Sequence, residues 1–128
     1  MTVVATTTTT TTKQRGDAAE DAALAHLEAA GLRLVTRNYR TPGRGGGEID
    51  LILRDPRDAT LVFVEVRQRA SDSHGGAGGS ITGVKRRRIV FAARHYLMDL
   101  HVLPPCRFDV VLVEAGRIEW LQGAFDAA

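Results

Sequence analysis

Apolar and polar residues alternate in two short segments near the middle of the chain, at residues 48–54 and 60–68. Successive side chains of a strand point to opposite faces, so this alternation predicts two β-strands. Val62, Val64 and Val66 then share one face and can fill a core, whereas Glu65 and Arg67 share the other face, about 6–7 Å apart. The Asp-Pro-Arg-Asp segment at 55–58 is typical of a tight turn and predicts that the two strands pair as a hairpin.

Two other segments carry apolar residues at helical spacing. The first runs from about residue 14 to residue 30, is rich in alanine, and ends before Gly31, a typical helix stop. The second runs from about Thr82 to Leu100. Its predicted apolar side consists of Val84, Ile89, Ala92, Ala93, Tyr96 and Leu97.

Three further strands complete the predicted fold. They lie at residues 32–41, 107–114 and 117–121, where apolar runs are bounded by glycine or proline. The resulting order is αβββαββ. Since a helical crossover lets the third and fourth strands lie parallel, we expect an α/β sandwich with a central mixed sheet.

The length of 128 residues fits one domain with a core of its own. Residues 1–12 form a threonine tract with nothing to bury, and we expect a disordered tail there, followed by a single folded domain at 13–128. Residues 70–79 are polar and rich in glycine, which predicts a mobile loop. The glycines at 43–47 lead into a strand rather than a helix, so they favour a flexible turn over a dinucleotide-binding loop.

Composition excludes several classes of protein. No apolar run approaches the roughly 20 residues of a membrane span, and the N-terminus lacks the features of a secretory signal. Cys106 is the only cysteine, which rules out an internal disulfide, and the four histidines are too dispersed for zinc-ligand spacing. These features predict a cytoplasmic protein without a membrane partner.

The basic residues are informative in kind and in place. Of the 17 lysines and arginines, all but Lys13 and Lys85 are arginine, which favours phosphate contacts, although a coding bias toward Arg, Ala and Gly is the plainer explanation. Residues 85–88 form a basic run in the second helix, with Arg94 further along. Lys85 shares the apolar side with Ile81 and Ile89, so it needs a partner such as a carboxylate or a phosphate. Arg86 and Arg87 should face solvent.

Asp50 and Glu65 are the candidate metal ligands. Both stand in apolar strands, where a charge is costly unless it is paired or binds a metal. Two carboxylates at equal depth on adjacent antiparallel strands suit Mg²⁺, which prefers carboxylate oxygens and keeps several waters. The base after Glu65, Arg67, would orient a water or stabilise charge on phosphorus. The plain alternative is that Asp50 caps a turn and Glu65 pairs with a nearby arginine.

Glu20 is a third acidic candidate. It precedes Leu24 by one helical turn and so lies on the stripe that carries Leu24 and Leu27. Spacing alone also allows an exposed residue beside Asp17 and Asp21, near a helix N-terminus where acids are favoured.

Seven motifs, spread from about residue 14 to residue 125, together resemble the YraN family of small bacterial proteins. The motifs are Gly16…Glu20, Arg37-Asn38-Tyr39-Arg40, Gly47-Glu48-Ile49-Asp50-Leu51, Val62-Phe63-Val64-Glu65-Val66-Arg67-Gln68-Arg69, Lys85 with Tyr96-Leu97, Arg107-Phe108-Asp109-Val110-Val111, and Ala124-Phe125. The resemblance implies a restriction-endonuclease-like fold, similar to that of archaeal Holliday-junction resolvases.

The resemblance also implies a catalytic set. In that group it consists of a helix-one Glu, an Asp and a Glu-x-Lys, which correspond here to Glu20, Asp50, Glu65 and Arg67, with Lys85 as a neighbour. The predicted nucleic-acid-binding residues are Lys85, Arg86, Arg87 and Arg69. The motif lysine is replaced by Arg67, which keeps a positive charge for phosphate but cannot act as a general base.

Three hypotheses follow from the sequence. The first is an endonuclease that uses Mg²⁺ or Mn²⁺ on DNA, with branched DNA as a candidate substrate. The second is a nucleic-acid-binding module that keeps the fold without efficient cleavage, as Arg67 favours. The third is a structural protein whose acids only pair with Arg67, Arg69 and Lys85. A homodimer is expected only by analogy with resolvases, whose substrates have two-fold symmetry.

Overall fold

The computed structural model describes residues 12–43, 45–68 and 81–127. The predicted loop at 70–79, Arg69 and most of the predicted tail therefore lie outside the described residues. Thr12, which the sequence placed in the tail, is instead the first residue of a helix.

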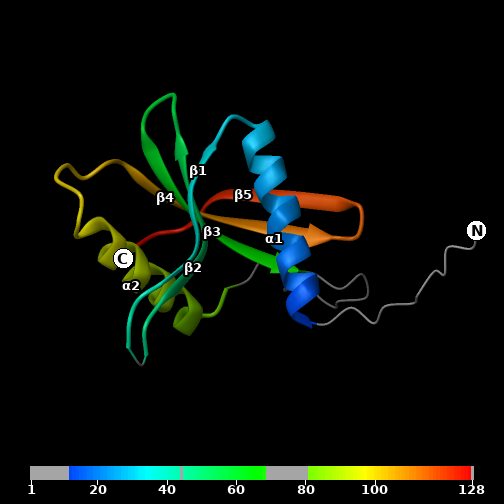
Figure 1. Ribbon diagram of the computed structural model, residues 1–128, viewed down its shortest axis with the longest axis horizontal. Coiled ribbons are helices and arrows are strands. Elements are labelled where there is room, and N and C mark those ends of the chain that lie inside the picture. The colour runs from blue at the N-terminus through cyan, green and yellow to red at the C-terminus, as the bar shows by residue number, and fades with distance from the viewer. Residues whose placement is uncertain (1–11, 44, 69–80, 128) are drawn as a thin grey trace, which may run out of the picture.

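Two helices and five strands make up the described part of the chain. In chain order they are α1 (Thr12–Ala29), β1 (Arg33–Arg40), β2 (Glu48–Asp55), β3 (Thr60–Gln68), α2 (Gly83–Leu97), β4 (Cys106–Glu114) and β5 (Arg117–Phe125). The strands form one sheet in the order β1-β2-β3-β4-β5. The predicted αβββαββ order and the mixed sheet are confirmed (Figure 1).

Chain connections explain the direction of each strand. Short turns join β1 to β2, β2 to β3 and β4 to β5, and each of these pairs is antiparallel. The link from β3 to β4 contains α2, and this pair is parallel, because only a long crossover can return the chain to the same end of the sheet. β3 lies in the centre of the sheet and is covered by α2 on one face and α1 on the other, so its apolar run is continuous from Leu61 to Val64.

The core has two layers because the helices pack on opposite faces of the sheet. On one face, Ala23 and Leu27 of α1 meet Leu51, Val62 and Val64, among others. On the other face, Ile89, Ala92 and Ala93 of α2 meet Ile52, Phe63 and Phe108. Figure 1 shows the sheet between the two helices. The odd positions of β3 thus point toward α2 and the even ones toward α1, as alternation predicts.

Most predicted boundaries lie within one or two residues of the observed ones, and the larger differences concern α2, β5 and Val84. α2 ends at Leu97 rather than Leu100, and β5 continues to Phe125 because its pairing with β4 extends as far as Phe108. Val84 was wrongly placed on the apolar side and is 58% exposed. The five-residue step from Val84 to Ile89 turns about 140° around a helix, so the two side chains cannot share a narrow face.

Asp109 is a fully buried carboxylate with a complete set of partners. It accepts hydrogen bonds from Arg107 Nε at 2.9 Å, from Trp120 Nε1 at 2.8 Å and from the Gly123 N–H at 2.9 Å. These bonds fasten β5 to β4 where the register between the two strands shifts, between Phe108 and Val110. The Arg-Phe-Asp-Val motif therefore has a structural role.

Replacing Asp109 with alanine should lower the free energy of unfolding by roughly 2–4 kcal/mol, because it removes the buried acceptor shared by the partly exposed Arg107 guanidinium, Trp120 Nε1 and the Gly123 N–H. Asp109→Asn keeps the shape but loses the charge, and should cost less. Urea unfolding measures both, with exposed Glu119→Ala as the control. A loss no larger than that of the control would contradict this role.

Candidate active site

Asp50 and Glu65 face each other across two neighbouring strands. The last regular pair between β2 and β3 is Leu51 with Val64, so continuing the register by one step places Asp50 opposite Glu65. Glu65 is an odd position of β3 and points to the α2 face, and Asp50 and Glu65 are only 9% and 6% exposed. The hairpin thus brings the two predicted ligands together at equal depth, as the sequence analysis expected.

The regular pairing of β2 with β3 ends at Leu51 and Val64, and the Asp50 side chain bonds to the β3 backbone just beyond this point. Its Oδ2 accepts a hydrogen bond from the Val66 N–H at 2.8 Å, taking the place of a strand carbonyl. A carboxylate held by a backbone donor has a fixed orientation, because the donor belongs to the sheet. Asp50 is therefore oriented by the fold itself.

Gly47 brings the start of β2 against α2. A Cβ at this position would collide with the Arg88 carbonyl and contact Ala92, so only glycine allows this approach. The Gly47 N–H also donates to Thr41 Oγ1 at 2.7 Å, which closes the turn before the strand. The close approach places Asp50 beside the first half of α2.

Burial and mutual repulsion disfavour the charged forms of the two carboxyls. Burial raises the pKa of Glu65 to about 8, with the charge of Asp50 as the next largest cause and Lys85 opposing both. Burial also raises the pKa of Asp50, against the Val66 N–H, which lowers it. The two side chains are hydrogen-bonded to each other, so at neutral pH and without a cation the pair retains one proton.

Lys85 provides the cation closest to Glu65. Its Nζ lies 3.4 Å from Glu65 Oε2, and its side chain is 39% exposed. The lysine comes from the first turn of α2, which Thr82 caps by accepting the Lys85 N–H at 3.1 Å. Lys85 thus has the carboxylate partner that its position on the apolar side required.

Glu20 points toward the same site from α1. Its side chain is 14% exposed and its Oε1 lies 3.3 Å from Arg37 Nη2. Burial is the largest cause raising the pKa of Glu20, and the charge of Asp50 is the second. The inward orientation, rather than an exposed position beside Asp17, is the one the structure shows.

Arg37 is a member of this site whose role the sequence analysis missed. From β1 it bridges Glu20 at 3.3 Å and Asp21 at 2.9 Å. Its Nε is buried without a hydrogen-bond partner within the described residues. Arg37 stands in one of the motifs that carry the family resemblance, which was the available signal, but nothing in its spacing connected it to α1.

Arg67 does not make the predicted contact with the acids. Within the described residues no ion pair or hydrogen bond joins Arg67 to Asp50 or Glu65, and Glu65 pairs with Lys85 instead. Alternation still places Arg67 on the same face of β3 as Glu65. Arg67 is two residues away from Glu65 along β3, whereas Lys85 of α2 lies directly beside Glu65 and forms the ion pair.

The other predicted nucleic-acid-binding residues divide into two groups. Arg86 and Arg87 are exposed on α2, as expected. Arg69 lies outside the described residues.

The acid pair fits a divalent metal. Asp50 and Glu65 would be its ligands, because two adjacent buried carboxylates that repel each other are the arrangement that a cation stabilises. Within 12–43, 45–68 and 81–127, no group of three or more His, Cys, Asp or Glu side chains is close enough to hold a metal. Mg²⁺ tolerates two protein ligands because it keeps several waters, whereas a structural zinc site does not.

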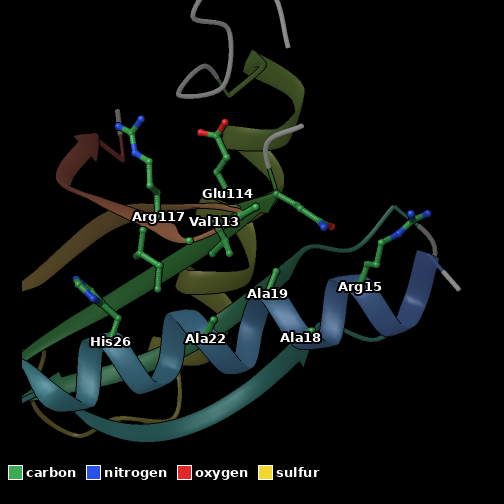
Figure 2. Close-up of a pocket in the computed structure, with 12 residues that line it drawn as sticks. Arg15, Ala18, Ala19, Ala22, His26, Val113, Glu114 and Arg117 are labelled. Carbon is green, nitrogen blue, oxygen red and sulfur yellow. The ribbon is translucent and has the colours of Figure 1, made fainter. Parts of the chain in front are cut away.

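A second hollow lies on the α1 side of the sheet. It has a volume of about 640 Å³ and lies between α1, which contributes Ala18, Ala22 and His26, and the β4–β5 hairpin, which contributes Glu114 and Arg117 (Figure 2). Neither Asp50 nor Glu65 lines it. Its walls combine small apolar residues with the polar side chains of Arg15, His26, Gln68, Glu114 and Arg117.

No helix in the described part of the chain is long and apolar enough to span a membrane. The protein is similar over most of its length to known bacterial proteins. The profile described as "Uncharacterised protein family UPF0102" matches residues 19–113. A UPF0102 protein of Paracidovorax citrulli is 75% identical over 112 residues, covering 88% of this chain and 82% of the relative. A UPF0102 protein of Albidiferax ferrireducens is 71% identical over 115 residues, covering 90% and 89%.

Among solved structures, the one described as "Crystal structure of SSO0001" matches with a TM-score of 0.44 and 13% sequence identity. The match covers 90% of this chain and 54% of that chain, so this chain spans about half of its length.

The raised pKa of Glu65 predicts a pH-dependent stability in the metal-free protein. The folded state binds a proton that the unfolded state releases near its ordinary pKa of 4.5, so stability should fall as pH rises from about 4.5 to about 8. The slope is at most on the order of 1 kcal/mol per pH unit. Urea unfolding in EDTA across this range measures it.

Glu65→Gln should reduce this slope, leaving the smaller part that comes from the raised pKa values of Asp50 and Glu20, and exposed Glu119→Gln should leave it unchanged. An unaltered slope in the Glu65 variant would mean that Glu65 is ionised throughout the range.

Proposed function

The chain belongs to the UPF0102 family, the restriction-endonuclease-like family of YraN proteins. From this premise we propose that it is a metal-dependent endonuclease that hydrolyses phosphodiester bonds of DNA. The observation that supports the proposal best is the burial of Asp50 directly opposite Glu65, with Lys85 Nζ 3.4 Å from Glu65. Branched DNA is the first substrate to test, and a cytoplasmic location follows from such a substrate.

Asp50 and Glu65 would hold the metal, Mg²⁺ or Mn²⁺. When bound, the metal polarises the phosphate and lowers the pKa of a water. The chain's own contribution is to fix the two carboxylates: the Val66 N–H orients Asp50, and the β2–β3 register sets Glu65 opposite it. Because both positions belong to the sheet, the site needs little rearrangement before reaction.

Hydrolysis also needs a base and cations from the chain. Water attacks phosphorus, its proton must be accepted, and the bond to the leaving oxygen breaks as that oxygen takes up a proton from solvent. Glu20 is the best candidate base because its pKa is raised and its oxygens are not required for the metal. Lys85 and Arg67 would be the cations for the charge that develops on the phosphate oxygens.

A second function, binding nucleic acid without cleavage, is favoured by one observation. Lys85 already neutralises part of the charge of Glu65, and the lysine of the Glu-x-Lys motif is replaced by Arg67. If Lys85 alone compensates the negative charge of Asp50 and Glu65, the two acids do not need a metal ion. Metal affinity therefore distinguishes the two functions.

Asp50→Asn and Glu65→Gln should each abolish Mg²⁺ and Mn²⁺ binding measured by calorimetry, and with it cleavage of labelled junction, flap and linear DNA. Both variants should remain folded, because each removes one of two repelling carboxylates and keeps the side-chain shape. Asp55→Asn, an acid at the far end of β2 that pairs with Arg57, is the matched control and should bind metal normally.

Wild-type protein that binds no divalent metal would refute the metal-dependent mechanism. Metal binding without cleavage of any of these substrates would favour the binding module.

Arg67 tests the phosphate contact. Arg67→Lys should preserve or increase the rate of cleavage, because it keeps the cation and restores the family's residue. Arg67→Ala should reduce the rate by about 100- to 1,000-fold, as for the loss of one transition-state donor. Single-turnover rates measure both, with Arg57→Ala at the β2–β3 turn as the control. Equal rates for wild type and Arg67→Ala would exclude Arg67 from the chemistry.

A further inference from the structure

α2 carries a basic surface that the acid pair does not use. Between Gly83 and Leu97 the sequence has five lysines and arginines and no acidic residue. Among the described residues, only Lys85 of these five forms an ion pair with an acid. Arg86 lies over the ring of Phe125, 5.8 Å from its centroid, and Arg94 Nη2 donates to the Ala127 carbonyl at 3.3 Å.

A groove runs between this surface and the end of β5. It has a volume of about 790 Å³, within the range of roughly 300–1,000 Å³ typical of ligand pockets. Its walls include Arg86, Arg87, Phe91 and Arg94 of α2 and Phe125 and Asp126 of the C-terminal segment. Figure 1 shows the C-terminal end of the chain beside α2. Three guanidiniums against a single carboxylate make the groove complementary to a polyanion.

Phe91 gives the groove a feature that charge alone lacks. It is 53% exposed, and its spacings of four from Arg87 and three from Arg94 place all three side chains along one side of the helix. An isolated exposed apolar residue is ordinary on a protein surface. An exposed ring between guanidiniums is the combination that binds successive bases and phosphates of an unpaired strand.

We propose that this groove binds a single-stranded segment of nucleic acid, with a base stacked on Phe91 and phosphates on Arg86, Arg87 and Arg94. The inference rests on the proposed function and deepens it, since it names a substrate that contains unpaired nucleotides. Duplex DNA would meet the arginines through its phosphates, but its base faces are stacked within the helix and cannot reach a ring.

The groove and the acid pair lie on different sides of one helix. Lys85 points inward to Glu65, and the next residue, Arg86, is turned about 100° from it, toward the groove. A substrate that contains unpaired nucleotides beside a duplex could contact the groove with its single strand and the acid pair with its scissile bond.

Binding without metal tests the groove separately from cleavage. In EDTA, fluorescence anisotropy of labelled single-stranded and duplex oligonucleotides should give tighter binding of the single strand. Phe91→Ala and Phe91→Leu should weaken single-strand binding about tenfold and leave duplex binding nearly unchanged, whereas Phe91→Trp should retain it. Val84→Ala, an exposed apolar residue of α2 outside the groove, is the matched control.

The phosphate contacts of the arginines should appear in the salt dependence of the binding affinity. Arg87→Ala should reduce the slope of log affinity against log salt by about 0.7 on single strands, because one phosphate contact is lost. Equal loss on both oligonucleotides in Phe91→Ala, or no loss on either, would overturn the proposal. So would an acidic peptide that binds in the groove with the same sensitivity to Phe91→Leu.

The outcomes for the groove and for the proposed function are distinguishable. Single-strand binding that depends on Phe91, in a protein that never cleaves, would keep the groove and reject the nuclease. Cleavage that persists with normal single-strand affinity in Phe91→Ala would keep the nuclease and reject the groove.

Discussion

The burial of two carboxylates side by side, Asp50 and Glu65, is the constraint to which the rest of the site responds. The strands β2 and β3 stop pairing at this point, and the released Val66 N–H is satisfied by Asp50. Gly47 allows β2 to approach α2 so closely that Lys85 reaches Glu65. Each of these features alone lowers the stability of the fold. The strand pairing is interrupted, Gly47 adds no side chain to the core, and Lys85 places a charge on the apolar side of α2. They become compatible only around a pair of acids.

Asp109 shows what a purely structural buried acid looks like in this fold. It is more deeply buried than either acid of the pair, yet Arg107, Trp120 and the Gly123 N–H satisfy both of its oxygens. Asp50 and Glu65 instead share one backbone donor and one lysine, and burial together with the charge of Asp50 raises the pKa of Glu65 to about 8. The contrast between one fully satisfied buried carboxylate and two that are short of positive charge supports the proposal that the acid pair binds a cation.

Local patterns predicted the fold better than they predicted the partners within the site. The alternation of Val62, Val64 and Val66 and the turn at Asp55 were enough to place Asp50 opposite Glu65, because a short hairpin leaves little freedom of register. The ion-pair partner of Glu65 was harder to predict, because the sequence offers both Arg67 and Lys85 as candidates. The structure selects Lys85 through the position of α2, which no local pattern specifies. The bridge from Arg37 to Glu20 depends in the same way on how α1 lies across β1.

α2 also explains how one helix serves two surfaces. Because consecutive helical residues are about 100° apart, a basic run of four cannot point in one direction. Packing of Ile89, Ala92 and Ala93 on the sheet fixes the rotation of the helix, so Lys85 must face the acids while Arg86 and Arg87 face outward. The inward and outward charges are therefore not independent: a substitution that rotated α2 to improve the groove would withdraw Lys85 from Glu65. This linkage requires any strand bound along α2 to be held in a fixed position relative to the acid pair.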